Sequence, residues 1–408
     1  MSPNFDHIVI LADESANWKI AGLRQLERLV LALDELAMSI SSQRKIDIFI
    51  FWRPDIAAEQ RWRPENPRLT RCNFVDALVV GGRERVFNTR LLVKRHGLEQ
   101  FVHDSVPLEN DATIGDEAAV WEKLWQRSEN AGANADRPTS ETWRYIASDS
   151  EITRGERWLL RGGGKSPDGL VSRFLNRPIS RAVSRVLLKT SITPTGWTWL
   201  ITVLPVIAFF FLIRGDYFGF VIGAALFQLY SILDGCDGEM ARATYLESKR
   251  GEFLDSFCDF VGSILFVVGL GIGLERPREG ILCAILIAAN ELFLGINPGK
   301  ISLTSPELYT RHRRMVEHSG LHYLEKVVWW LANLTKRDVA LLFFLVLALI
   351  SLPDWILHLW TLVAGMSVIL SSVATLRAGS REKLGAPPRF YRRTKYDARG
   401  QRDGEPLH

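Results

Sequence analysis

The chain has 408 residues, 47% of them apolar, and a formal net charge of +4. This length exceeds what one ordinary core needs, and a mean hydropathy of +0.03 is too polar for a chain embedded wholly in a bilayer, so two unlike parts are expected. The small charge and the lack of basic or aromatic clustering argue against nucleic acid as a partner. The four cysteines have neither metal nor disulfide spacing, which indicates reduced thiols.

The first 130 residues predict a soluble α/β domain. Residues 7–12 and 46–52 resemble buried strands, and residues 23–38 between them form an amphipathic helical pattern. A further strand is expected at 76–80, a turn at Gly81-Gly82 and a helix at 89–101. This order predicts a mainly parallel sheet. The start of the chain lacks a cationic leader, so the domain is expected in the cytoplasm.

The segment ILADESANWKIAGLRQLERLVLAL resembles the start of cytidylyltransferase-type nucleotidyltransferases, where a strand leads to a Gly-rich loop, a lysine and a helix. Here DESANW contains no glycine, so the usual backbone cradle for a triphosphate is missing, although Lys19 is present. Two interpretations stay open: a degenerate domain with a structural or regulatory role, which the missing loop favours, and an active cytidylyltransferase.

Residues 131–167, which include RPTSET and LLRGGGKSPDG, are expected to be a linker. Residues 168–190 then predict an interfacial helix, capped by Asp168 and bent at Pro178, with an apolar side and a cation every four residues. The cations of this row are Arg173, Arg177, Arg181, Arg185 and Lys189. Such a row favours anionic headgroups, and one or two of its members could also contact substrate phosphate.

Residues 191–378 predict an all-α membrane domain of six transmembrane helices. The apolar runs are 194–214, 217–241, 252–274, 280–297, 339–353 and 355–376. Cations concentrate in the longer connections, which predicts that both termini lie on the cytoplasmic side of the membrane. The membrane is expected to be the inner or plasma membrane of a bacterium or an archaeon. Arg311, Arg313 and Arg314 between the fourth and fifth runs suit headgroup anchoring or a phosphate site equally. Residues 379–408 are expected to be disordered.

The second and third runs carry an acidic cluster at their cytoplasmic ends. Helical spacing puts one stripe on the second run and another on the third: Asp234, Asp237, Gly238, Ala241 and Arg242, then Gly251, Asp255 and Asp259. If the stripes face each other, mutual repulsion would protonate the carboxylates unless divalent cations neutralise them. Ligands that are all oxygen favour Mg²⁺ or Mn²⁺, with coordination positions left for substrate phosphates.

Three other interpretations of this cluster stay open. The aspartates could be a solvated helix end beside small residues that merely permit close packing. A Mg²⁺-dependent membrane prenyl-diphosphate transferase also uses paired aspartates, but on two well-separated segments. A non-enzymatic cation transporter would be indicated by broken helices or an internal repeat, and the sequence shows neither.

The pattern D-x-x-D-G-x-x-A-R, eight residues, G-x-x-x-D-x-x-x-D resembles the signature of the CDP-alcohol phosphotransferases, and residues 243–250 are its spacer. The resemblance implies that a CDP-alcohol donates its substituted phosphoryl group to an acceptor hydroxyl, releasing CMP, in phospholipid or polyol-phosphodiester synthesis. It implies metal ligation by Asp234, Asp237 and Asp255, with Asp259 a further ligand or the general base. Gly238, Ala241, Arg242 and Gly251 would line the nucleotide.

A cytidylyltransferase-like domain joined to this signature resembles the bifunctional inositol-phosphate cytidylyltransferase and di-inositol-phosphate-phosphate synthase arrangement, and SPDGLVSRFLNRPIS strengthens the likeness. The donor would then be CDP-inositol or another CDP-polyol, or alternatively CDP-diacylglycerol. The acceptor would be an alcohol or a polyol phosphate such as inositol 1-phosphate. Relatives commonly pair, which is compatible with a homodimer. Thr193-Pro194-Thr195 departs from the Pro-Asn of many relatives.

Overall fold

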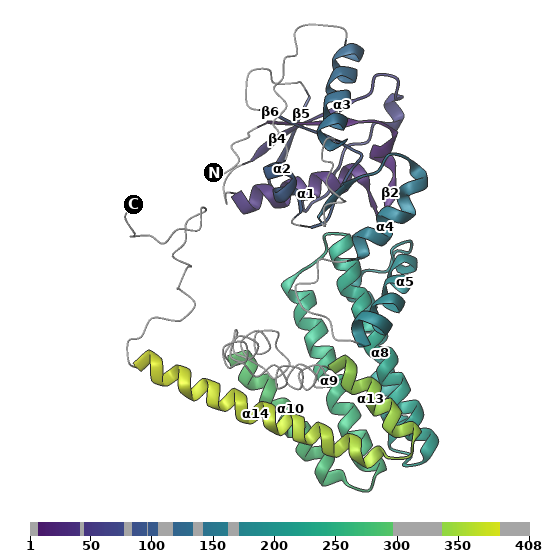
Figure 1. Cartoon of the computed structure of the whole chain (residues 1–408), viewed down its shortest axis with the longest axis vertical. Coiled ribbons are helices and arrows are strands. Elements are labelled where there is room, and N and C mark those ends of the chain that lie inside the picture. The colour runs from purple at the N-terminus through teal and green to yellow at the C-terminus, as the bar shows by residue number, and fades with distance from the viewer. Residues whose placement is uncertain are drawn as a thin grey trace, which may run out of the picture. The chain divides into compact units, whose positions relative to one another are not determined.

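The structure is a computed structural model that describes residues 7–40, 45–76, 84–95, 97–104, 117–133, 142–161, 171–296 and 337–383 (Figure 1). The chain divides into two compact units. The first comprises Met1–Leu204 and Phe227–Asp259, and the second comprises Pro205–Leu226 and Phe260–His408. The first unit therefore contains both the α/β domain and the two helical segments that carry the acidic signature.

In the described residues, four parallel strands form the sheet at the centre of the α/β domain, in the order β5-β4-β1-β6. Its strands are β1 (His7–Ala12), β4 (Ile46–Trp52), β5 (Cys72–Val75) and β6 (Glu84–Asn88). Helix α1 (Gln25–Ile40) connects β1 to β4, as the predicted β-α-β order requires. The predicted strands at 7–12 and 46–52 and the helix between them are thus confirmed.

Alternate side chains of β1 belong to two hydrophobic cores, one on each face of the sheet. Ile8 and Ile10 belong to a cluster with α1, whereas Val9 and Leu11 pack with Trp121 and other side chains of α3 (Glu117–Ala133). Successive strand residues point to opposite faces, so a strand covered by helices on both sides must be apolar throughout. The domain is consequently a three-layer α/β/α structure.

Shorter elements complete this domain. They are η1 (Glu14–Asn17), β2 (Lys19–Ile20), β3 (Leu23–Arg24), η2 (Ala58–Gln60), β7 (Leu91–Val93), α2 (Gly97–Asp104), β8 (Trp143–Tyr145), η3 (Asp149–Glu151) and α4 (Ile152–Leu160). Strands β2 and β3 form one antiparallel pair, and β7 and β8 form another.

Two expectations for this domain need correction. The helix predicted at 89–101 is wrong, because Leu91–Val93 is a strand paired with β8 and the helix begins only at Gly97. The linker expected at 131–167 contains β8 and α4, and Ile146 and Trp158 pack in a core with Leu92. The expected turn at Gly81-Gly82 and most of the strand expected at 76–80 lie outside the described residues.

The helical region begins with a π-helical turn (Ser172–Asn176) that continues into α5 (Arg177–Leu187), within the segment predicted to be interfacial. Pro178 is the second residue of α5, which follows the π-helical turn directly, so it lies at the point where the hydrogen-bond pattern of the helix changes. The helices that follow are α6 (Pro194–Ile201), α7 (Val203–Leu212), α8 (Tyr217–Ala243), α9 (Lys249–Gly273), α10 (Pro277–Ile296), α13 (Arg337–Leu349) and α14 (Pro353–Lys383).

Three segments of the described chain are long and apolar enough to cross a membrane: Pro194–Leu212, Tyr217–Ala243 and Lys249–Gly273. Asp338–Leu349 and Pro353–Ile369 are shorter apolar helices. The first span is divided at Thr202, three residues before Pro205, so one helix that the sequence suggested to be continuous has a break. Six transmembrane helices stay a prediction.

Close helix packing characterises the second unit. A Cβ at Gly273 would lie 2.0 Å from the Leu212 carbonyl oxygen, so only glycine permits this approach. The polar Asn290, within the predicted apolar run of residues 280–297, accepts a hydrogen bond from Ser367 Oγ at 2.7 Å. Helix α14 continues to Lys383, and residues 384–408 of the expected disordered tail lie outside the described residues, as do Arg311, Arg313 and Arg314.

Candidate active site

Three aspartates from two helices meet at one point. Asp234 and Asp237 lie on α8 and Asp255 lies on α9, and one carboxylate oxygen from each is within 4.8 Å of the others. The spacing of three between Asp234 and Asp237 puts both on the same helix face, and the connector of residues 244–248 turns α9 back toward it. The predicted convergence of the two stripes is therefore present for these three residues.

This trio fits a hard divalent cation. All of its donor atoms are carboxylate oxygens, which Mg²⁺ and Mn²⁺ prefer. Octahedral coordination at about 2.1 Å separates ligand oxygens by about 3 to 4 Å, so the 4.8 Å cluster needs only small adjustments. Asp237 is 8% exposed, and three carboxylates confined this closely need a compensating positive charge.

Asp259 is not part of the trio. It lies four residues after Asp255 on the same face of α9 and accepts a hydrogen bond from the Tyr230 hydroxyl at 3.0 Å. Tyr230 is completely buried, so its ring fixes the direction from which the hydroxyl reaches the carboxylate. Asp259 is thus an oriented carboxylate one helical turn from the cluster.

Helix α6 contributes a residue that the sequence did not indicate. Thr198 donates its hydroxyl hydrogen to Asp237 Oδ2 at 2.5 Å and is 3% exposed. Thr193 caps this helix by accepting the Gly196 N–H at 3.1 Å, and Pro194 occupies the first turn. The Thr-Pro pair that departs from the family pattern therefore starts the helix that orients Asp237.

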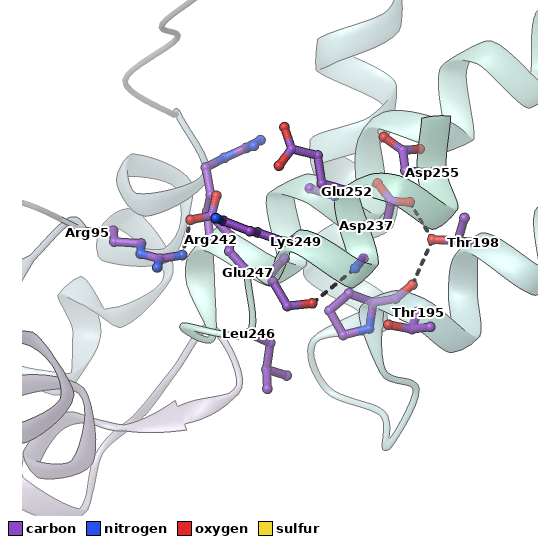
Figure 2. Close-up of a pocket in the computed structure, with 15 residues that line it drawn as sticks. Arg95, Thr195, Thr198, Asp237, Arg242, Leu246, Glu247, Lys249, Glu252 and Asp255 are labelled. Atoms are coloured by element: carbon purple, nitrogen blue, oxygen red, sulfur yellow. Dashed lines mark hydrogen bonds and ion pairs between the residues drawn. The ribbon is translucent and has the colours of Figure 1, made fainter. Parts of the chain in front are cut away.

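A pocket of about 470 Å³ adjoins the trio (Figure 2). Three cations, Arg95, Arg242 and Lys249, and four carboxylates share its wall. Its lining residues are Arg95, Pro194, Thr195, Thr198, Asp237, Gly238, Ala241, Arg242, Leu246, Glu247, Ser248, Lys249, Gly251, Glu252 and Asp255. Six of the eight signature residues are among them, and Asp234 and Asp259 are not. Arg95, which comes from the α/β domain, and Thr198 were both missed by sequence reasoning.

The signature glycines have distinct local roles. A Cβ at Gly238 would lie 3.1 Å from Arg242 Nη1, so the missing side chain lets the guanidinium fold back over the helix. Gly251 donates its N–H to Ser248 Oγ at 3.0 Å, which satisfies a free donor at the start of α9. Gly238 thus leaves room for Arg242 at the pocket wall.

Opposite the aspartate stripe, α8 carries the buried Glu239. This carboxylate accepts hydrogen bonds from Ser180 Oγ and Ser184 Oγ at 2.8 Å each and pairs with Arg177 at 3.2 Å. Its side chain is 2% exposed, so the charged partner and both hydroxyls are needed to offset desolvation. Arg177, expected to meet lipid headgroups, instead ties α5 to the helix that bears two of the aspartates.

The α/β domain has a second polar cluster, at the carboxyl end of β1. Asp13, Ser15 and Thr89 are completely buried, and Ser15 and Thr89 both hydrogen-bond to Asp13. Arg90 pairs with Asp13 at 3.0 Å and lies over the ring of Trp125. This edge, beside the point where strand order reverses, is where open α/β sheets usually bind ligands. Here the chain's own side chains fill it.

Comparison with known proteins agrees with this geometry. A family model described as CDP-alcohol phosphatidyltransferase matches residues 192–368. The chain is 27% identical over 242 residues to the bifunctional IPC transferase and DIPP synthase of Archaeoglobus fulgidus, which covers 58% of this chain and 45% of the relative. Its counterpart in Thermococcus kodakarensis is 39% identical over 118 residues, 29% of this chain and 26% of the relative.

A third relative, the inner membrane protein YnjF of Escherichia coli, is 31% identical over 179 residues, which is 44% of this chain and 79% of the relative. The chain thus spans less than half the length of the two bifunctional relatives but most of the shorter one. The chain belongs to the CDP-alcohol phosphatidyltransferase family, a family of transferases, as its acidic signature suggested.

Proposed function

We propose that this chain transfers a substituted phosphoryl group from a CDP-alcohol to the hydroxyl of an acceptor alcohol and releases CMP. The observation that supports the proposal most is the meeting of Asp234, Asp237 and Asp255 beside a pocket that Arg242 also lines. Phosphoryl transfer depends mainly on positioning and on neutralising negative charge, and it requires no nucleophilic side chain.

Asp234, Asp237 and Asp255 would hold Mg²⁺ or Mn²⁺, which when bound neutralises the charge of the diphosphate. Thr198 holds the Asp237 carboxylate in one orientation by donating to its Oδ2, while the Gly238 N–H donates to its Oδ1. The guanidinium of Arg242 holds the diphosphate from the side by charge-assisted hydrogen bonds. Gly238, Ala241 and Gly251 leave room for the nucleotide along the same wall.

Asp259 is assigned as the general base, with metal ligation as the alternative role. The acceptor oxygen forms a bond to the phosphorus that carries the alcohol, and the bond from that phosphorus to the bridging oxygen of CMP breaks. The hydroxyl proton passes to the Asp259 carboxylate, which Tyr230 holds in place. The products are the phosphodiester and CMP.

The donor class is a CDP-polyol such as CDP-inositol, or CDP-diacylglycerol, and the acceptor is an alcohol or a polyol phosphate such as inositol 1-phosphate. The relatives named bifunctional IPC transferase and DIPP synthase support the polyol choice. We further propose six transmembrane helices with both termini and the acidic pocket on the cytoplasmic side. The cations of the longer connections support this orientation.

We propose that the α/β domain has lost cytidylyltransferase activity. The loop Asp13–Trp18 lacks glycine, and the carboxyl end of β1 is filled by the Asp13–Arg90 pair. Lys19, the counterpart of the expected lysine, is exposed on the short strand β2. Incubation of the purified chain with CTP and inositol 1-phosphate should therefore produce no CDP-inositol, and measurable production would contradict this assignment.

The test of the transferase proposal is a substrate panel. Purified full-length protein in liposomes is given Mg²⁺, labelled CDP-inositol or CDP-diacylglycerol, and a set of polyol and polyol-phosphate acceptors. We expect CMP release that requires both an acceptor and Mg²⁺, with a phosphodiester of matching mass. If CMP release requires neither, or if prenyl diphosphates react instead, the proposal is wrong.

A further inference from the structure

The short connector between the two aspartate-bearing helices, residues 244–248, and the end of α8 before it are held by the α/β domain. Helix α8 ends in a Schellman arrangement, in which the Leu246 N–H reaches back to the Ala241 carbonyl at 2.9 Å. The left-handed residue in this arrangement is usually glycine, but here it is Tyr245, with φ of 57°. A connector with a tyrosine at this position needs support from outside itself.

Two arginines of the α/β domain provide part of that support. Arg28 donates a hydrogen bond to the Ala243 carbonyl at 2.6 Å, and Arg68 donates to the carbonyls of Thr244 and Tyr245 at 3.1 and 2.6 Å. The last carbonyls of a helix lack intrahelical partners and form the negative end of its dipole. The α/β domain therefore caps α8 with two positive charges.

Arg28 is placed for this role by its surroundings. Its side chain is 1% exposed, and a second guanidinium nitrogen donates to the Ile20 carbonyl at 2.6 Å. Burial lowers the pKa of Arg28, because the charged guanidinium is less stable away from water. The carbonyl groups to which it donates offset part of this cost. Arg68 is oriented by Asn66, which is itself held by Glu27 of α1 at 2.8 Å.

The ring of Tyr245 completes the attachment. It packs against the hydrophobic core on the α1 side of the sheet, and burial raises the pKa of its hydroxyl to about 12. At the other end of the connector, Glu247 forms an ion pair with Arg95, which Glu35 of α1 also contacts at 2.5 Å. Arg95 and Glu247 both line the pocket (Figure 2).

From these contacts we infer that the α/β domain is a positioning domain for the acidic pocket: Arg28, Arg68 and Tyr245 fix the connector and thereby the spacing of Asp237 and Asp255. The connector is the only covalent link between the helix ends that bear these two aspartates. Its path sets how far α9 stands from α8. Arg28, Arg68 and Tyr245 are positioning residues, since none of them lines the pocket.

The inference rests on the proposed divalent-cation site but not on the identity of the substrate. The test is made on the full-length protein with Arg68→Ala, Arg68→Lys and, as a matched control, Arg63→Ala. Arg63 is an arginine of the same domain that pairs with Asp76 and is half exposed. Hydrogen exchange of the connector and Mn²⁺ affinity, followed by electron paramagnetic resonance, are measured without any substrate.

Arg68→Ala should speed exchange in residues 243–248 about tenfold and weaken Mn²⁺ binding several-fold, because a charge-assisted hydrogen bond to the connector is lost. Arg68→Lys should recover part of both, and Arg63→Ala should match the wild type. Exchange in β1 and α1 should be unchanged, which shows that the α/β domain is still folded. Where activity is measurable, Arg68→Ala should lower kcat more than it raises KM.

Faster connector exchange with unchanged Mn²⁺ affinity would overturn the inference, because the attachment would then have no effect on the acidic pocket. Unchanged connector exchange would overturn it as well. If the wild type binds Mn²⁺ but releases no CMP from any CDP-alcohol, the proposed function fails while the positioning role is still measured. The two failures are therefore distinguishable.

Discussion

Thr198 on α6 and Asp237 on α8 are 39 residues apart in the chain, and a 2.5 Å hydrogen bond joins them in the buried wall of the pocket. The Trp197 indole N–H also donates to the Leu233 carbonyl at 3.0 Å, so two consecutive residues of α6 bind the same stretch of α8. Asp237 therefore has a fixed orientation before any ligand arrives.

Removal of the Thr198 hydroxyl should weaken metal binding. We expect Thr198→Val, which keeps the shape of the side chain, to reduce Mn²⁺ affinity about tenfold, because groups that orient a metal ligand typically contribute this much. Thr198→Ser keeps the hydroxyl and should stay close to the wild type. Equal Mn²⁺ affinity of the valine and serine variants in a direct titration would show that this hydrogen bond does not matter.

The two aspartates of α9 should differ in their kinetic roles. Asp255→Asn should remove turnover by weakening metal binding, whereas Asp259→Asn should leave CDP-alcohol binding largely intact and abolish transfer, because it cannot accept the hydroxyl proton. CMP release and equilibrium binding of a CDP-alcohol measure the two effects separately. Wild-type CMP production by either purified variant would contradict its assignment.

Gly238→Ala tests the placement of Arg242. The new methyl group would lie 3.1 Å from Arg242 Nη1, a contact that the flexible guanidinium can relieve by moving away from its present position. We expect a raised KM for the CDP-alcohol with an unchanged melting temperature. Gly223→Ala, where the methyl would lie 2.6 Å from Leu212, is a contrasting control that should lower the melting temperature. A wild-type KM for Gly238→Ala would contradict the assignment of Arg242 to the diphosphate site.

High pH should loosen the attachment of the connector through Tyr245. The pKa of Tyr245 is raised from 10 to about 12 by burial, so the unfolded chain loses this proton before the folded one does. Its contribution to stability is complete below about pH 10 and is lost as pH rises toward 12. Tyr245→Phe should therefore be less sensitive to pH in this window.

The same substitution should be neutral or stabilising at pH 7. In the described part of the chain the Tyr245 hydroxyl is buried without a hydrogen-bond partner, an arrangement that costs about 1 to 3 kcal/mol. Tyr245→Ala removes the ring as well and should destabilise the protein. The measurement is the midpoint of thermal unfolding from pH 7 to 11.5. A phenylalanine variant that loses stability with pH as steeply as the wild type would contradict this account.

Local sequence patterns predicted the elements whose signals are local. The β1-α1-β4 unit follows from apolar periodicity, and the spacing of Asp234, Asp237 and Asp255 placed them on two helix faces that do meet. The sequence wrongly predicts a helix at Leu91–Val93, because a run of three apolar residues fits a helix or a strand and the partner strand, Trp143–Tyr145, is distant in the chain.

The residues that other elements contribute to the pocket could not be predicted, because their partners also lie far away in the sequence. Thr198 and Arg95 reach the pocket only through tertiary packing, and neither belongs to a recognisable motif. Glu239 was equally hidden, since a glutamate on a helix is ordinarily exposed and its burial depends on Arg177 and two serines of α5. A single sequence carries no signal for such pairings.

The most direct test of the account is a Mn²⁺ titration of the purified full-length protein, followed by electron paramagnetic resonance, for the wild type and Asp255→Asn. We predict saturable binding to the wild type, competed by Mg²⁺, and affinity at least tenfold weaker in the variant, because one of three converging ligands has lost its charge. Mn²⁺ binding of equal strength in both proteins, or no saturable binding to the wild type, would contradict the claim that aspartates of two helices form one cation site.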